Sequence, residues 1–210
     1  MVRISASILG FLFDARKNKE SSQVMIDNIN KTLVQKSGDF DILHFDIEDG
    51  TFVPHKSFTS SQVMKVKCEK KREAHLMVVN YKKYLKEFFP CAQMFIFHEE
   101  VLMQDFPRTI EFLKRNKKFV GISINPNTPV DDIKYLDKIN LVLVMSVYPG
   151  LPEQKFIETT IRKIQKLKDV RTKKRLRFVI EVDGGINKDN VKRLADAGAD
   201  IVVMGTGLFK

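Results

Sequence analysis

Five polar side chains come at or near the ends of short apolar segments, where folding could gather them into one site. They are Ser7, His44, Asp46, His75 and Asp183. Two imidazoles with two carboxylates form a donor set that suits Zn²⁺, Fe²⁺, Mn²⁺ or Co²⁺, and it does not choose among these metals. The sequence therefore suggests one divalent metal site, and the simpler interpretation, that each side chain is a hydrogen-bonded structural residue, stays open.

Short apolar segments recur along the chain at a regular interval and predict eight strands. In LVLVMSV and IVVM the apolar residues are consecutive rather than alternating. Consecutive apolar positions indicate burial on both faces, which is typical of parallel strands covered by helices. The predicted strands are residues 3–9, 41–47, 73–79, 94–98, 119–124, 141–147, 177–182 and 200–204.

Amphipathic segments of helical period lie between these strands, at residues 22–36, 156–167 and 187–197. The last of them begins at Asn187, a good N-cap, and ends before Gly198. Repeated strand–helix units in about 200 residues predict a single-domain α/β fold over 1–210, a (β/α)₈ TIM barrel, with an open doubly wound sheet as the alternative. Only a few residues follow the last strand, so we expect the eighth closing helix to be missing. Either the sequence is truncated after Lys210 or a partner covers that edge.

In such a barrel the carboxyl ends of the strands face one active site. His44 and Asp46 are two residues apart on one strand, so both point to the same side, into the barrel. His75 lies on the next strand, and Asp183 ends the seventh. The predicted fold therefore brings the four metal-type ligands to one face.

Two glycine-containing turns follow the predicted strands seven and eight. The first is Gly184–Gly185, just before the helix at Asn187, and the second contains Gly205 and Thr206. Barrels commonly bind phosphate through backbone N–H groups at these two loops. The turns therefore predict a phosphate site, although ordinary turns would have the same sequence.

The composition excludes several other classes of protein. The 210 residues are 43% hydrophobic and 30% charged, which argues against collagen-like, disordered and coiled-coil chains. No apolar run is long enough to span a membrane and no secretory signal is evident, so we expect a cytoplasmic protein with reduced Cys68 and Cys91. The net charge of +10 is spread over helix-like segments without a nucleic-acid motif, and we expect neither nucleic acid nor membrane as a partner.

Over nearly its whole length the chain resembles the ribulose-phosphate 3-epimerase family. The matching segments occur in family order and are SASIL (5–9), LHFDIEDGTFVP (43–54), HLMV (75–78), FHEE (97–100), GISINPNTP (121–129), LVMSVYPG (143–150), VDGGI (182–186) and AGADIVVMGTGLF (197–209). The resemblance implies a (β/α)₈ barrel, a divalent metal and a ketopentose phosphate substrate in the pentose phosphate pathway. It also implies a homo-oligomer.

The resemblance assigns roles to individual positions. It implies that His44, Asp46, His75 and Asp183 bind the metal, and that Asp46 and Asp183 are also the two acid/base groups. It further implies that substrate contacts come from Ser7, His75, Met77, Met145, Gly184, Gly185, Gly205 and Thr206.

Two departures from the family pattern bear on the substrate. Glu48 stands where the family has a methionine near the metal, and Pro152 and Glu153 replace two glycines of a loop near the phosphate end. A carboxylate at 153 would repel a phosphate. These three residues are candidate specificity elements.

The expected activity is metal-dependent 3-epimerisation between D-ribulose 5-phosphate and D-xylulose 5-phosphate. A carboxylate on each face of the substrate would remove and return a proton through an enediolate. The alternatives are an epimerase of a related sugar phosphate such as allulose 6-phosphate, another phosphate-binding barrel enzyme such as a decarboxylase, and a catalytically silent binding paralogue.

Overall fold

Eight parallel strands form a closed ring in the computed structural model, which describes residues 2–150 and 154–209. Each strand pairs with its neighbours in chain order, and β1 also pairs with β8. The strands are β1 (Arg3–Ser7), β2 (Ile42–Glu48), β3 (Lys71–Met77), β4 (Met94–His98), β5 (Phe119–Ile124), β6 (Leu141–Met145), β7 (Val179–Asp183) and β8 (Ile201–Met204). The structure therefore confirms the predicted barrel and excludes the open sheet.

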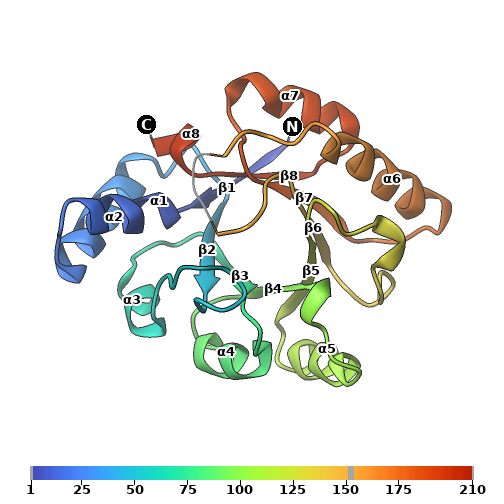
Figure 1. Ribbon diagram of the computed structural model, residues 1–210, viewed down its shortest axis with the longest axis horizontal. Helices are drawn as coiled ribbons and strands as arrows, with labels where there is room; N and C mark the ends of the chain where they lie inside the picture. Colours follow the sequence, from blue (N-terminus) through green and yellow to red (C-terminus); the bar gives the residue numbers. More distant parts are fainter. Residues whose placement is uncertain (1, 151–153, 210) are drawn as a thin grey trace.

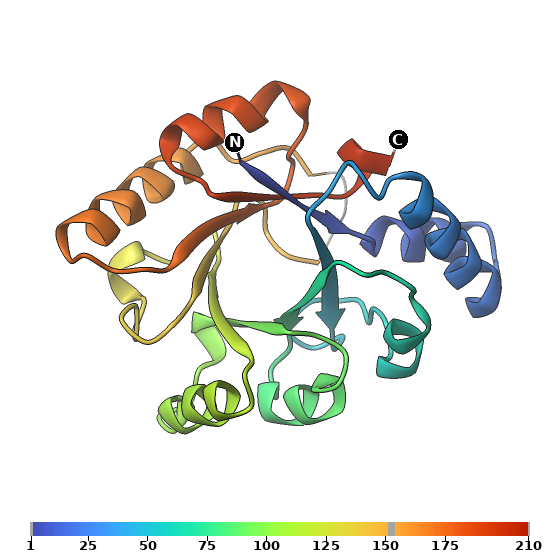
Figure 2. The same cartoon turned by 180° about the vertical axis from the view of Figure 1, so that it is seen from behind.

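Helices surround the ring on its outside, as the two opposite views of Figures 1 and 2 show. They are α1 (Leu9–Lys17), α2 (Ser22–Gln35), α3 (Ser60–Lys65), α4 (Tyr81–Phe88), α5 (Phe106–Arg115), α6 (Thr160–Lys173), α7 (Lys188–Ala197) and α8 (Thr206–Phe209), with 3₁₀ turns η1 (Glu99–Val101) and η2 (Val130–Asp132). Local capping defines several ends. The Asn187 side chain accepts backbone N–H bonds at the start of α7, and Gly198 ends that helix at φ 120°.

The strand–helix alternation is not strict. Two helices, α1 and α2, separate β1 from β2, whereas only the 3₁₀ turn η2 lies between β5 and β6. The helix predicted from residue 156 begins instead at Thr160. Ile157 donates its backbone N–H to the Ser146 carbonyl at 2.8 Å, which holds this segment against the end of β6.

The predictions for the last edge of the barrel are wrong. A one-turn helix, α8, follows β8, so an eighth helix is present, although it is short. β8 pairs with β1, so its edge is not open, and its outward-facing Val202 and Met204 are buried. The ring thus needs no partner to cover this strand.

Apolar side chains form two separate clusters. The larger one fills the space between the strands and the helices, where Phe45, Phe95 and Phe97 are fully buried. The smaller one lies inside the ring and is formed by Ile96, Leu141, Leu143, Met145, Val147, Ile201 and Val203. The rest of the interior, on β1, β2, β3 and β7, is lined by polar side chains, and this half carries the site.

None of the helices in the described ranges is both long and apolar enough to cross a membrane.

Candidate active site and metal centre

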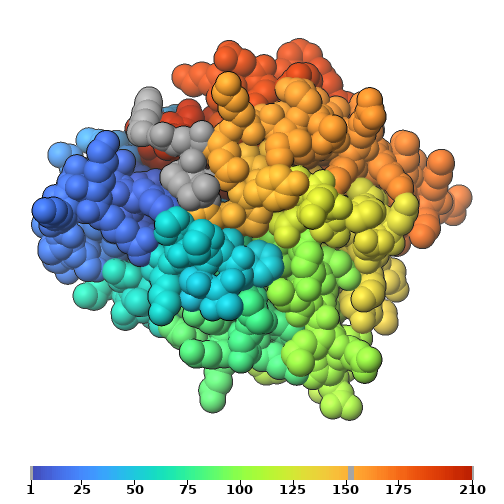
Figure 3. All heavy atoms as spheres, viewed as in Figure 1, coloured from blue at the N-terminus to red at the C-terminus, as the bar shows by residue number. Residues whose placement is uncertain are grey.

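A cavity of about 410 Å³ opens at the carboxyl ends of the strands. Its wall includes almost all of the side chains predicted to work together, namely Ser7, Asp46, Glu48, Met77, Met145, Asp183, Gly184, Gly185, Gly205 and Thr206. Over the barrel axis, the segment after β2 (cyan in Figure 3) lies against the orange segment that precedes α6. The cavity is lined by residues from both halves of the chain.

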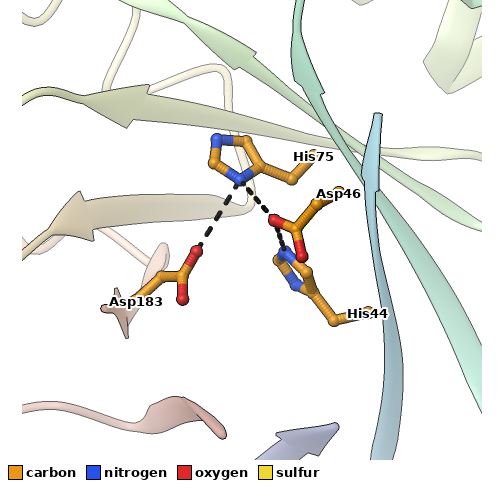
Figure 4. Close-up of side chains that lie close together, drawn as sticks. All are labelled: His44, Asp46, His75 and Asp183. Carbon is orange, nitrogen blue, oxygen red and sulfur yellow. Dashed lines mark ion pairs between the residues drawn. The ribbon is translucent and has the colours of Figure 1, made fainter. Parts of the chain in front are cut away.

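Two histidines and two aspartates converge at the base of this cavity (Figure 4). The Asp46 Oδ1 atom lies 3.3 Å from His44 Nε2 and 3.5 Å from His75 Nδ1. Asp183 Oδ2 lies 3.8 Å from the same His75 nitrogen. The structure therefore brings together all four residues that the sequence analysis predicted as metal ligands.

This arrangement fits a divalent cation. His44 Nε2 and His75 Nδ1 are buried, and neither has a hydrogen-bond partner among the described residues. Ligands about 2.1 Å from a tetrahedral Zn²⁺ are about 3.4 Å from one another, close to the separations found here. The four side chains can hold one metal without a change of fold.

The ring of His44 is oriented by a carboxylate beneath it. His44 Nδ1 lies 2.8 Å from Glu73 Oε1, and both side chains are buried. If Nδ1 carries the proton and donates it to Glu73, the Nε2 lone pair is free for a metal. Burial alone would lower the pKa of His44, but Asp46 and Glu73 raise it well above its usual value.

A second relay orients His75. Its Nε2 lies 2.9 Å from His98 Nε2, and His98 Nδ1 lies 3.1 Å from Glu100 Oε2. A proton on His98 Nδ1, donated to Glu100, leaves His98 Nε2 to accept from His75 and leaves His75 Nδ1 free for a metal. Despite burial, which raises it, the pKa of Glu100 is lowered to about 2 because His98, Thr128 and Asn125 donate to the carboxylate. Glu100 can therefore act as the anionic end of the relay.

Ser7 contacts the metal centre rather than only the cavity. Its hydroxyl donates to Asp46 Oδ2 at 2.7 Å, while Oδ1 of the same carboxylate faces the two histidines. Ser7 therefore fixes the plane of the Asp46 carboxylate.

The two aspartates have opposite electrostatic environments. Burial raises the pKa of Asp46, but this effect is exceeded by His44 and His75, which lower it. Burial and the neighbouring Asp46 raise the pKa of Asp183 to about 7. A bound cation would lower the pKa of both. Two carboxyls held at different pKa values are suited to acid and base roles.

Comparison with known proteins identifies the family. The model of the ribulose-phosphate 3-epimerase family matches residues 20–209. The chain belongs to this family. It is 33% identical to the ribulose-phosphate 3-epimerase of Bacillus subtilis, over all of this chain and 93% of that protein. It is 34% identical to the cytoplasmic isoform from Oryza sativa subsp. japonica, over 80% of this chain and 75% of that protein.

The family identifies the chain as a carbohydrate epimerase. A mutant tryptophan synthase α-subunit from Pyrococcus furiosus matches 99% of this chain, and 89% of its own, with a TM-score of 0.69 at 14% identity. That likeness concerns the fold alone, and it agrees with the closed eight-stranded barrel.

The two glycine turns of this epimerase lie on the cavity rim, after β7 and β8. Gly184 and Gly185 have φ of 114° and 63°, and a Cβ on Gly185 would lie 2.6 Å from the Phe156 nitrogen. The backbone N–H groups of Gly185, Gly205 and Thr206 donate to no acceptor among the described residues. These features are compatible with a phosphate at the rim.

Of the three candidate specificity residues, only Glu48 lies in the described part of the chain. Glu48 lines the cavity of this epimerase, and burial and then Asp46 raise its pKa to about 8. Pro152 and Glu153 lie outside the described residues, so their proposed effect on the substrate stays a prediction.

Sequence reasoning missed the side chains that support the metal ligands. Besides the His98–Glu100 relay, a second buried group lies below the metal centre, where Glu73, Glu181 and His44 have ligand atoms within 4.8 Å of one another. Burial and then Glu73 raise the pKa of Glu181 well above its usual value. A signal was present, because Glu73 precedes His75 and Glu181 precedes Asp183 by two residues, which places each pair on one face of its strand.

Proposed function

We propose that this protein is a metal-dependent 3-epimerase that interconverts D-ribulose 5-phosphate and D-xylulose 5-phosphate. The observation that carries the proposal is the pair of carboxylates, Asp46 and Asp183, which reach one cavity from strands on different sides of its base. Epimerisation next to a ketone needs a proton removed from one face of the carbon and returned on the other. A carboxylate on each face can do both.

The protons move between these two residues and the substrate. One aspartate removes the C3 proton, and the other delivers a proton to the opposite face of the enediolate. The reverse reaction exchanges their roles. Ser7, which donates to Asp46 Oδ2, keeps that carboxylate in a fixed orientation while its other oxygen is used.

His44, Asp46, His75 and Asp183 would hold the divalent cation, which is Zn, Fe, Mn or Co. A bound cation supplies Lewis-acid stabilisation of the negative charge that develops on the substrate oxygens. Glu73 and His98 orient the rings of His44 and His75 so that Nε2 of His44 and Nδ1 of His75 would face the cation, which would take the place of any proton on these nitrogens. Met77 and Met145 line the cavity with apolar surface and exclude water from the carboxylates.

The phosphate of the substrate would bind at Gly184, Gly185, Gly205 and Thr206. The backbone N–H groups of Gly185, Gly205 and Thr206, which have no acceptor among the described residues, can donate hydrogen bonds to an anion, and the glycines allow the phosphate to approach the backbone. The turns and the two aspartates line the same cavity, so one ketose phosphate would contact both.

The test is C3 proton exchange in D₂O. Ribulose 5-phosphate is incubated with metal-loaded protein, and NMR follows loss of the C3 proton signal together with formation of xylulose 5-phosphate. Two-base epimerisation predicts one deuterium at C3 of the product. Chelation should abolish turnover, and one of the four metals should restore it. Metal-loaded protein that neither exchanges nor epimerises this substrate would contradict the proposal.

The runner-up activity is epimerisation of a related sugar phosphate such as allulose 6-phosphate. Glu48 in the cavity wall supports this alternative activity, because a buried carboxyl changes which arrangement of substrate hydroxyl groups the cavity accepts. Running the same exchange experiment on pentulose and hexulose phosphates decides between the two. A metal-loaded protein that binds but does not turn over any of them would be the silent paralogue.

We further propose that the protein works in the cytoplasm and as a homo-oligomer. Cys68 and Cys91 are both free, as expected in a reducing compartment. Self-association rests on the family resemblance alone, since the closed ring removes the argument from an open edge. Sedimentation at several protein concentrations would test it.

A further inference from the structure

Glu48 is the one cavity-lining side chain of β2 that the proposed reaction leaves without a task. It follows Asp46 by two residues on the inward face of the strand, and it is only 3% exposed. Neither of its carboxyl oxygens has a hydrogen-bond partner among the described residues, 2–150 and 154–209. A buried polar group left unpaired in this way is costly, so a partner that enters the cavity would be favoured.

The neighbours of Glu48 do not supply that partner. Its register partner on β3 is Met77, which has no donor. Ser57 accepts from the Glu48 backbone N–H and donates to the Asp46 carbonyl, so its hydroxyl is already used. Arg16 is near enough to act on the charge of Glu48, but its guanidinium donates to the Lys56 carbonyl and not to Glu48. Among the described residues no donor reaches the carboxyl, so a molecule in the cavity is the source that we consider.

Glu48 is also not a fifth ligand of the metal centre. The ligand atoms that lie within 4.8 Å of one another come from His44, Asp46, His75 and Asp183, and Glu48 is not in that group. It lies about 6.6 Å further along β2 than Asp46, at the usual rise of a strand, and therefore above the metal centre. Its carboxyl faces the part of the cavity that the substrate would fill.

The position of Glu48 on the strands places it away from the turns that would bind the phosphate of the substrate. The two phosphate turns follow β7 and β8, whereas Glu48 is on β2, three strands from β7 around the ring. A ketose 5-phosphate anchored at those turns runs from C5 through C4 to C3, where Asp46 and Asp183 meet. In that pose the C1 end would lie away from the turns, on the side of the cavity that Glu48 and Met77 line.

We infer that Glu48 is a specificity-determining residue whose carboxyl accepts a hydrogen bond from the C1 hydroxyl of the substrate. The inference rests on the proposed function, and it names the substrate end that the site reads. A methionine at this position would tolerate a substrate with or without that hydroxyl, whereas a buried, unpaired carboxyl selects the hydroxylated one.

The experiment compares two substrates that differ only at C1, xylulose 5-phosphate and 1-deoxyxylulose 5-phosphate. Exchange of the C3 proton in D₂O reports on both by NMR, with metal-loaded protein. We expect the wild type to favour the hydroxylated substrate by about 2- to 10-fold in kcat/KM, the range for a hydrogen bond between uncharged groups. In Glu48→Met this ratio should fall to near 1, mainly through slower exchange of xylulose 5-phosphate.

Two further variants separate this role from a structural one. Glu48→Gln keeps a hydrogen-bonding oxygen of the same reach, so it should retain part of the discrimination. Glu99→Gln changes another buried glutamate, one that lies outside the active-site cavity, and should leave the ratio unchanged. A purely structural effect of Glu48 would slow both substrates alike.

Equal rates for the two substrates in the wild type would overturn the inference, even if Glu48→Met did not fold. A preserved ratio in Glu48→Met would also overturn it. Both results leave the proposed function standing, because exchange is still observed. If metal-loaded wild type exchanges neither these substrates nor ribulose 5-phosphate, the proposed function fails and the inference falls with it.

Discussion

The interior of the ring is divided into two halves with opposite chemistry. On β2, β3 and β7 the inward side chains include His44, Glu73, His75, Glu181 and Asp183, all of which are buried or nearly so. On β6 and β8 the equivalent positions carry Leu141, Leu143, Met145, Ile201 and Val203, which pack together. In both halves these side chains point from the strands into the interior of the ring.

The two halves of the interior contribute to different properties: the polar half to binding and catalysis, and the apolar half to the stability of the fold. In the polar half, His44, Glu48, His75 and Glu181 each keep a buried polar atom without a partner among the described residues, which disfavours the folded state. In the apolar half every buried methylene stabilises it, by about 0.8 kcal/mol. Substitutions in the polar half should therefore change activity much more than stability, and substitutions in the apolar half should do the reverse.

The largest effect is expected for Asp183→Asn. The amide cannot accept the substrate proton, so kcat for epimerisation should fall by about 10²–10⁴-fold or more. The melting temperature should not fall, because the substitution removes a carboxyl that Asp46 repels. Asp137→Asn, at an exposed position, is the matched control and should keep wild-type turnover. Turnover close to wild type in Asp183→Asn would mean that a different group moves this proton.

Next in size is Leu143→Ala in the apolar half. Leu143 is fully buried in the interior cluster, so truncation should lower the free energy of unfolding by about 2–5 kcal/mol. Urea denaturation followed by circular dichroism measures this. The exposed Val34→Ala should change it by less than about 0.5 kcal/mol. If the free energy of unfolding of Leu143→Ala is not lower than that of Asp183→Asn, the proposed division between the two halves is contradicted.

A smaller effect is expected one layer below the metal centre. In Glu73→Gln the His44 ring loses its anionic acceptor, so affinity for the cation should fall by about 10- to 100-fold. Competition with a chromophoric chelator at fixed pH measures it, with the exposed Glu69→Gln as control. Unchanged affinity would show that the carboxylate does not act through His44.

The smallest effect concerns Glu99, a buried carboxyl outside the ring. Burial raises its pKa from the ordinary 4.5 to about 7, despite the nearby Lys134. Between these values the folded state holds a proton that the unfolded state has lost, so this group makes the free energy of unfolding fall as pH rises from about 4.5 to about 7. Glu99→Gln lacks the titration. Its stability relative to wild type should therefore rise over that pH range and then level off, as measured by urea denaturation at each pH. A flat difference would mean that the raised pKa is not realised at this site.

The sequence predicted the four candidate metal ligands, and it placed each strand boundary within two residues of the observed one, because both follow from local patterns. The apolar runs ended within two residues of the strand ends, and the spacing of His44 and Asp46 placed both on one face. The same patterns could not supply the partners of these ligands. His44 meets Glu73 because β2 and β3 pair in a register that places them opposite each other, and register is a property of two distant segments.

Two other features were out of reach for related reasons. The helical period of residues 156–167 is real, but Ile157 is held by the Ser146 carbonyl, a contact that competes with the first helical turn. The His75–His98 contact joins adjacent strands at the ring nitrogens, so it depends on side-chain orientation. The FHEE segment contained both members of the relay that ends at Glu100, without any local sign that they act on His75.

Pairing of β1 with β8 has a consequence for how the chain reaches its fold during synthesis. Arg3 lies opposite Ile201, so one edge of β1 has no partner until almost 200 further residues have been added. At about 5–20 residues per second, translation takes about 10–40 s to cover that distance. Until then β1 has an exposed edge in any sheet that has already formed, a state that invites association with other chains. Closure of the ring must therefore await the synthesis of β8, and the time before it is when a chaperone would matter most.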